Sequence, residues 1–235
     1  MADFNDIGIP RQLDWPRVRK LLTIGVFGSL LHLTGDLILG WGVEDESLAG
    51  LFRMLSAYTA TSDGGILASA LLGLFGMTLE GLSLFGVYRL MAEKFPRDAH
   101  RYRSGILGYL IFGACGFHVP TCALVFLGKQ GLPEETLARF ALYFLLPATA
   151  LFWVFFLLLA VTQIAAFAKG RTPYPRWCWV FSPLVGGLAA QALGFLGNLP
   201  LLNAIACAWL AIGCLWMFGG LLGLAKSAER RSNAL

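Results

Sequence analysis

Four ionisable side chains interrupt otherwise apolar stretches of this sequence, and their types are those that transfer protons or bind metals. His32 and Asp36 lie in LLHLTGDLILGW (residues 30–41), Glu80 lies in a second apolar stretch and His118 in a third. A helix would place His32 and Asp36, four residues apart, on one face. Such a set predicts an acid–base site, in which Asp36 or Glu80 is the base and His118 and His32 orient it or donate the proton.

The same residues are compatible with a metal site. Two histidines and two carboxylates suit zinc or another divalent ion, and His32, Asp36 and His118 are the expected ligands. Cys115 and Cys122 would add soft ligands. A haem held between His32 and His118 is a less favoured variant. The sequence contains no GxSxG, HExxH or P-loop motif, so the type of reaction stays open.

Two further interpretations compete with an enzyme. Carboxylates at two depths would suit a small proton-coupled carrier, although six helices are few and no inverted repeat is visible. Alternatively, the polar residues only fasten helices to one another. For the enzyme or a binding protein, we expect a lipid-like or small amphipathic ligand, contacted by Gln191, Asn198 and Tyr88.

The elements that must position these residues are membrane helices. The chain of 235 residues is 57% hydrophobic and 14% charged, with a mean hydropathy of +0.68. Soluble domains carry roughly 25% charged residues. We therefore predict an all-α polytopic bundle, a single membrane domain over 1–235, with six transmembrane helices. The predicted spans are 18–41, 65–91, 104–128, 137–168, 178–198 and 201–225. Pro147 is expected to kink the fourth span, and a break there is the alternative.

The distribution of basic residues predicts the orientation. Fifteen of the 18 lysines and arginines, Arg11 among them, flank one set of span ends, and only Arg53, Lys129 and Arg139 flank the other set. By the positive-inside rule, both termini lie in the cytoplasm. Residues 1–17 make a poor signal peptide and are expected to stay attached. The basic residues form no concentrated patch, so no nucleic-acid partner is expected.

Depth along the spans then brings the ionisable residues to similar levels. His32 and His118 fall at matching depth in the outer half, with Asp36 above them and Glu80 beneath, at 1.5 Å per residue. Three stripes rich in small or polar residues are expected to face the bundle interior: Gly28, His32 and Asp36; Gly73, Gly76, Glu80 and Ser83; Cys115, His118 and Cys122. The sequence thus predicts an outward-facing polar cavity.

The longest outer connection is residues 42–64, in which Leu48, Leu51, Phe52 and Leu55 repeat at helical spacing. This pattern predicts a short helix at the outer surface. Such a helix is either packed onto the bundle as part of the loop or acts as a lid over the cavity. The five cysteines form no CxxC pair, and no disulfide framework is expected.

Three short stretches carry a resemblance to a family. GDLILGW in the first span, LASALLGLFGMTLEGLSLFGVYRLM in the second and GFHV in the third resemble those of uncharacterised bacterial six-span membrane proteins. The resemblance implies six spans, a bacterial inner (plasma) membrane location with the lipid bilayer as partner, and importance for Asp36 and His118. It implies no activity.

Overall fold

The structure is a computed structural model that describes residues 13–92 and 94–233, and in these residues it contains helices and no strand. Arg11 and the rest of residues 1–12 lie outside the described residues. The helices are α1 (Trp15–Gly40), α2 (Gly50–Ser56), α3 (Asp63–Ala92), α4 (Pro96–Tyr109), the π-helix η1 (Leu110–His118), α5 (Val119–Lys129), α6 (Glu134–Phe140), the π-helix η2 (Ala141–Leu145), α7 (Leu146–Ala168), the 3₁₀ helix η3 (Arg176–Val180), α8 (Pro183–Gly194), α9 (Pro200–Cys207) and α10 (Trp209–Asn233).

Five helical stretches within the described residues are long and apolar enough to cross a membrane. They are Trp15–Gly40, Asp63–Ala92, Pro96–Lys129, Glu134–Ala168 and Trp209–Asn233. This agrees with a membrane helical bundle. Three of the predicted spans fall inside the second, third and fourth stretches, and the first, 18–41, ends one residue after Gly40.

The observed helices differ from the predicted fifth and sixth spans. The segment 178–198 contains α8, a helix of only 12 residues, where a full span needs about 17–25. Pro183 begins α8, since proline fits the first helical turn and its predecessor avoids helical geometry. The segment 201–225 is divided at Ala208 into α9 and α10, and α10 continues to Asn233.

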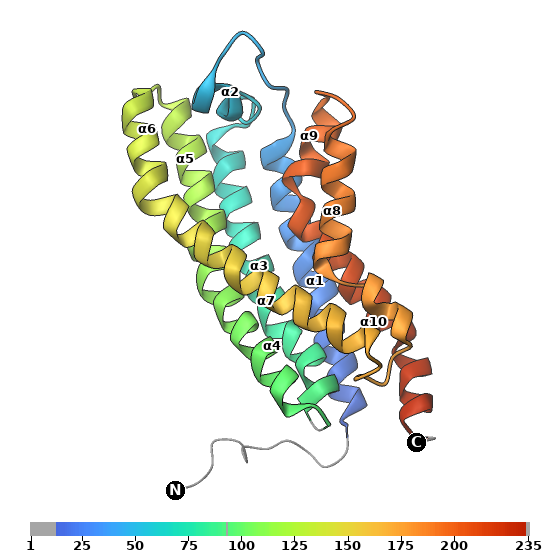
Figure 1. Ribbon diagram of the computed structural model, residues 1–235. Coiled ribbons are helices and arrows are strands. Elements are labelled where there is room, and N and C mark those ends of the chain that lie inside the picture. The colour runs from blue at the N-terminus through green and yellow to red at the C-terminus, as the bar shows by residue number, and fades with distance from the viewer. Residues whose placement is uncertain (1–12, 93, 234–235) are drawn as a thin grey trace, which may run out of the picture.

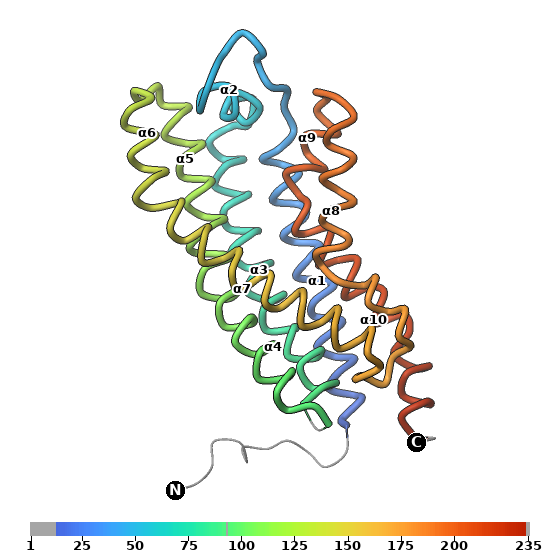
Figure 2. Tube along the Cα trace, in the orientation of Figure 1, coloured from blue at the N-terminus to red at the C-terminus, as the bar shows by residue number. Residues whose placement is uncertain are grey.

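The bundle has two distinct ends (Figure 1). At one end, called here the basic end, α1 begins, α3 connects to α4, and α10 finishes. At the opposite end, called here the α2 end, lie α2, the α5–α6 connection and the α8–α9 turn. Figure 2 shows α7 crossing obliquely from the α6 side toward α10, which leaves α5 and the α8–α9 pair on opposite sides of α1 and α3.

Glycines allow α1 and α3 to pack with their backbones nearly in contact. A methyl group added at Gly28 would lie 2.9 Å from the carbonyl oxygen of Gly76, and one added at Gly76 would lie 2.6 Å from the backbone nitrogen of His32. Small residues serve this purpose at membrane helix interfaces. The close approach brings the face of α1 that carries His32 against the face of α3 that carries Glu80.

Two prolines explain the π-helical segments. Pro120 and Pro147 each follow a π segment by two residues, and both lack the N–H that would bond to the carbonyl four residues earlier. The chain widens before each proline, where Val119 N–H bonds to Ala114 and Leu146 N–H to Ala141, five residues back. Glu134–Ala168 therefore remains one continuous helix, as the predicted kink at Pro147 requires.

Asn198, in the α8–α9 turn, ties this turn to the connection after α1. Its side chain donates to the Glu44 carbonyl (2.9 Å) and accepts from the Glu44 N–H (3.0 Å). Asn203 donates both to Asn198 (2.9 Å) and to the Gly42 carbonyl (2.8 Å). This network fixes the α2 end around the candidate site.

Replacing Asn198 with alanine is expected to lower the free energy of unfolding by about 1–3 kcal/mol, because net hydrogen-bond contributions are about 1 kcal/mol each. Thermal unfolding in detergent measures this loss. Asn233→Ala, at the exposed end of α10, is the matched control and should unfold like the wild type. Equal unfolding temperatures for the two variants would show that the network contributes no stability.

Candidate functional site

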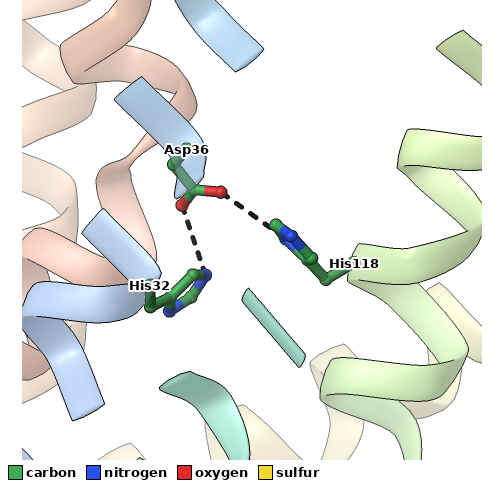
Figure 3. A group of neighbouring side chains, drawn as sticks. All are labelled: His32, Asp36 and His118. Carbon is green, nitrogen blue, oxygen red and sulfur yellow. Dashed lines mark ion pairs between the residues drawn. The ribbon is translucent and has the colours of Figure 1, made fainter. Parts of the chain in front are cut away.

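Asp36 lies between the two histidines predicted to accompany it (Figure 3). One of its carboxylate oxygens is 3.2 Å from Nε2 of His32, and the other is 3.5 Å from Nδ1 of His118. All three side chains are buried, with at most 5% of each residue exposed. His32 and Asp36 come from α1, and His118 is the last residue of η1. The predicted match in depth between the two histidines is confirmed, since their ring centroids are 5.5 Å apart.

The far side of each imidazole also has a partner. Nε2 of His118 lies 3.0 Å from the carbonyl oxygen of Ser69 on α3, and because a carbonyl only accepts, this nitrogen carries the proton. Nδ1 of His32 lies 3.2 Å from a carboxylate oxygen of Glu80, so His32 lies between two carboxylates, Glu80 and Asp36. In a neutral His118 ring, Nδ1 therefore holds a lone pair that faces Asp36.

Glu80 lies beneath this group, as predicted. It is 1% exposed, and the Tyr109 hydroxyl donates to it at 2.6 Å. The same hydroxyl is 3.7 Å from Sγ of Cys214 on α10. Residues from α1, α3, α4 and α10 thus form one polar chain from Asp36 to Cys214. This series of polar contacts ends at Cys214. Cys214 belongs to the larger of two clusters of buried apolar residues, which also includes Met77.

A cavity of about 330 Å³ borders the group. Asp36, His32 and His118 lie on its wall, whereas Glu80 does not. The remaining lining comes from α1, the α2 region, η1, α5 and α8–α10. It is apolar at Leu39, Phe117, Trp209 and Leu210, and polar at Glu44, Tyr58, Thr121, Gln191 and Asn203. The cavity therefore has a buried polar wall and apolar walls beside it.

Tyr58, in the connection after α2, also lines this cavity. The negative form of the neighbouring Cys207 raises the pKa of Tyr58 well above its usual value, and burial and Asp36 raise it further. Tyr58 consequently keeps its proton at neutral pH and remains a hydrogen-bond donor.

The predicted ligand-contacting residues are only partly assembled. Gln191 lines the cavity and donates to the Ala206 carbonyl at 2.7 Å. Asn198 does not line the cavity, but it donates a hydrogen bond to the carbonyl of Glu44, which does. Tyr88 is distant: it lies eight residues past Glu80 on α3, toward the basic end, with its ring against Phe85. Tyr88 does not line this cavity, and eight residues of helix separate it from Glu80 by about 12 Å.

The cysteine stripe also differs from expectation. Cys115 is exposed, whereas His118 and Cys122 are buried. The stripe assumed α-helical spacing, but a π turn contains an additional residue and rotates Cys115 away from the face of His118. Sγ of Cys122 lies 3.8 Å from Nε2 of His118, on the side of the ring that faces Ser69 and not Asp36. Neither cysteine is placed to share a ligand with Asp36.

The connection between α1 and α3 contains the predicted short helix. Leu55 of α2 is buried in the smaller apolar cluster, with Leu51 and Phe52 packed against it, while Leu48 is 41% exposed. Met54 of the same helix lines the cavity. The helix is therefore packed onto the bundle and also borders the cavity.

Tyr109 is the main polar residue of the site that the sequence interpretation omitted. The third span was predicted to begin at 104, whereas its helix begins at Pro96. With the observed ends, Glu80 lies 12 residues before the end of α3 at Ala92, and Tyr109 lies 13 residues after Pro96. The equal depth of Glu80 and Tyr109 could have identified Tyr109. The predicted start of the third span at 104 was too late in the sequence for this match to be visible.

His32, Asp36 and His118 are arranged as ligands of a divalent metal ion would be. Their ligand atoms all lie within 4.8 Å of one another. Zinc bonds of 2.0–2.1 Å in a tetrahedron separate neighbouring ligand atoms by about 3.3 Å, close to the distances from Asp36 to His32 and to His118. The bonds from His32 to Glu80 and from His118 to Ser69 are the outer partners that metal-bound histidines usually have. Haem fits poorly, because Asp36 occupies the space between the two rings.

Comparison with known proteins identifies a family and no activity. No curated protein and no solved structure matches the chain. A family model described as "Family of unknown function (DUF6796)" matches residues 4–228, a range that includes His32, Asp36, Glu80 and His118. The match spans nearly the whole sequence and agrees with the predicted resemblance to uncharacterised proteins. The chain belongs to this family of unknown function.

Proposed function

We propose that the protein is a metal-dependent membrane enzyme, with the ion held by His32, Asp36 and His118 and a lipid-like substrate bound in the adjacent cavity. One observation carries the proposal. His118 directs its N–H away from the cavity, to the Ser69 carbonyl, and the lone pair of its neutral ring toward Asp36, while His32 lies between Asp36 and Glu80. The lone pair of His118 repels the Asp36 carboxylate, and a cation among the three groups turns this repulsion into attraction.

The ligand number favours catalysis over a structural role. Structural zinc sites have four protein ligands, whereas catalytic sites have three and leave a position for water or substrate. Here three residues border an open cavity. A bound zinc ion supplies a water with a pKa near 7, suited to hydrolysis. Tyr58, on the wall of the same cavity, would hydrogen-bond a substrate oxygen.

The cavity walls favour an amphipathic substrate. Phe117 and Trp209 provide apolar surface beside the polar wall formed by Asp36 and the histidines. A reacting ester or amide group would face Asp36, and a hydrocarbon chain would lie along the two aromatic rings. Such a molecule would come from the bilayer itself.

The membrane arrangement proposed here has six spans, with η3 and α8 together forming the fifth and α9 and α10 the sixth. Fourteen described lysines and arginines lie near the basic end, and only Arg53, Lys129 and Arg139 lie near the α2 end. This asymmetry supports a cytoplasmic basic end and an outward-facing cavity, in the inner membrane of a bacterium.

The polar chain argues against a carrier. It runs from Asp36 through His32, Glu80 and Tyr109 to Cys214, and it ends there in an apolar cluster. A carrier needs polar groups leading to both surfaces. A purely structural role for the polar residues remains distinguishable by experiment, because fastened helices need neither metal nor substrate.

An activity assay tests the proposal. Protein reconstituted with zinc is incubated with phosphatidylethanolamine and phosphatidylglycerol, and the released products are identified by mass spectrometry. We expect turnover that stops on chelation, returns with zinc, and falls at least 100-fold in Asp36→Asn. His100→Ala, an exposed histidine on α4, is the control and should retain activity. Turnover that survives both chelation and Asp36→Asn would contradict a metal site at Asp36.

Glu80→Gln is expected to weaken zinc binding by about 10–100-fold, the range found for outer-shell partners of metal ligands. The amide keeps the shape of the side chain and removes the charge that supports His32. Competition with a fluorescent chelator measures the affinity. Glu135→Gln on α6, where the carboxylate is exposed, removes the same charge far from the site. Unchanged affinity in Glu80→Gln would show that Glu80 does not support the metal ligand.

A further inference from the structure

A second cavity lies at the basic end, on the other side of the large apolar cluster from Asp36. Its volume is about 150 Å³, several times the roughly 30 Å³ that one water molecule occupies. Four separate parts of the chain line it: the end of α3 and the α3–α4 connection, the loop after α7, the residues before α1, and the end of α10. The cavity is therefore built by the tertiary fold.

Three cations converge on this cavity, and we call it the cationic pocket. Its lining includes Arg89, Lys94 and Arg171. Arg171 is held in place, because one guanidinium nitrogen donates to Asp98 and the group lies 5.5 Å above the centre of the Phe95 ring. Asp98 offsets one of the three positive charges. A cavity with an excess of positive charge attracts an anion of matching size.

Thr172 also lines the cationic pocket. The hydroxyl oxygen of Thr172 is buried and has no hydrogen-bond partner within residues 13–92 and 94–233. Leaving such a group unsatisfied costs about 1–3 kcal/mol, so a ligand oxygen there would be favourable. Arginine side chains and a hydroxyl together form the usual donor set for a phosphate group.

We propose that the cationic pocket binds the phosphate of an anionic phospholipid headgroup. The pocket lies where α3 and α7 end, which is the level of the headgroups for helices that cross the bilayer. Leu90 and Pro173 add apolar surface beside the cations, as a lipid requires and a free phosphate does not. Basic pockets between helices on the cytoplasmic side are typical headgroup sites. This inference does not depend on the metal site.

Native mass spectrometry of the full chain tests the proposal. Protein in detergent receives equal amounts of phosphatidylglycerol and phosphatidylcholine with identical acyl chains. We expect the wild type to retain phosphatidylglycerol at least ten-fold more than phosphatidylcholine. The double variant Arg89→Gln/Lys94→Gln should lose about five-fold in affinity for each removed cation. Arg97→Gln/Arg101→Gln, two exposed cations of α4 outside the pocket, removes the same charge and should bind like the wild type.

A third variant separates the pocket from protein stability. Thr172→Val keeps the charge and the volume and should weaken retention several-fold without lowering the unfolding temperature. Equal retention of the two lipids by the wild type, or equal losses in the two double variants, would overturn the proposal. Displacement of the lipid by glycerol 3-phosphate at an equal concentration would overturn its assignment to a lipid headgroup.

Discussion

His118→Ala is expected to abolish stoichiometric zinc binding and lower zinc affinity by more than the roughly 10–100-fold typical for an outer-shell residue. The substitution removes one of three ligands, and the methyl group left behind offers no lone pair to replace it. His118 also anchors η1 to α3 through Ser69, so some loss of stability is expected in addition. Chelator competition measures the affinity, and thermal unfolding measures the stability.

His100→Ala is the matched control, because His100 is exposed on α4 and lies outside the cavity. It should bind zinc like the wild type. If His118→Ala and His100→Ala both retained one tightly bound ion per chain, the ligand assignment would be wrong. Loss of zinc in both variants would indicate adventitious binding to histidines in general.

Gly73→Ala should abolish zinc binding while leaving all three ligands present. A methyl group at Gly73 would lie 2.0 Å from Nε2 of His118, so the ring must move and its bond to Ser69 must break. The displaced ring no longer directs Nδ1 at Asp36. Overpacking costs about 1–3 kcal/mol, so the protein should fold with a lowered unfolding temperature.

Gly64→Ala is the matched substitution at the start of the same helix, where an added methyl group has no atom within 4 Å. It should retain zinc and unfold at or above the wild-type temperature, since alanine favours helix over glycine. If Gly73→Ala bound zinc as tightly as Gly64→Ala, His118 would not need the position observed here.

The convergence of the site could be predicted from the sequence because depth and face follow from regular helix geometry. His32, Asp36 and Glu80 lie on helices without internal proline, and the stripes through Gly28 and Gly76 do face the interior. Regular periodicity holds in α1 and α3, so counting residues placed these groups correctly.

The features that could not be predicted arise where helix geometry departs from that regularity. The π segment before Pro120 rotates Cys115 away from His118, and no periodicity in the sequence marks it. Because the third span begins at Pro96 and not at 104, Tyr109 lies deeper than predicted, at the level of Glu80. Pro183 gives α8 a later start than the apolar run indicates, and no periodicity in the sequence marks the break at Ala208.

X-ray absorption spectroscopy of the zinc-loaded, full-length protein tests the central claim most directly. We predict one zinc ion per chain, with nitrogen and oxygen ligands at about 2.0–2.1 Å, scattering from two imidazole rings and no sulfur. A sulfur shell at about 2.3 Å would instead indicate Cys122 or another cysteine as a ligand. That spectrum, or one without imidazole scattering, would contradict a metal centre formed by His32, Asp36 and His118.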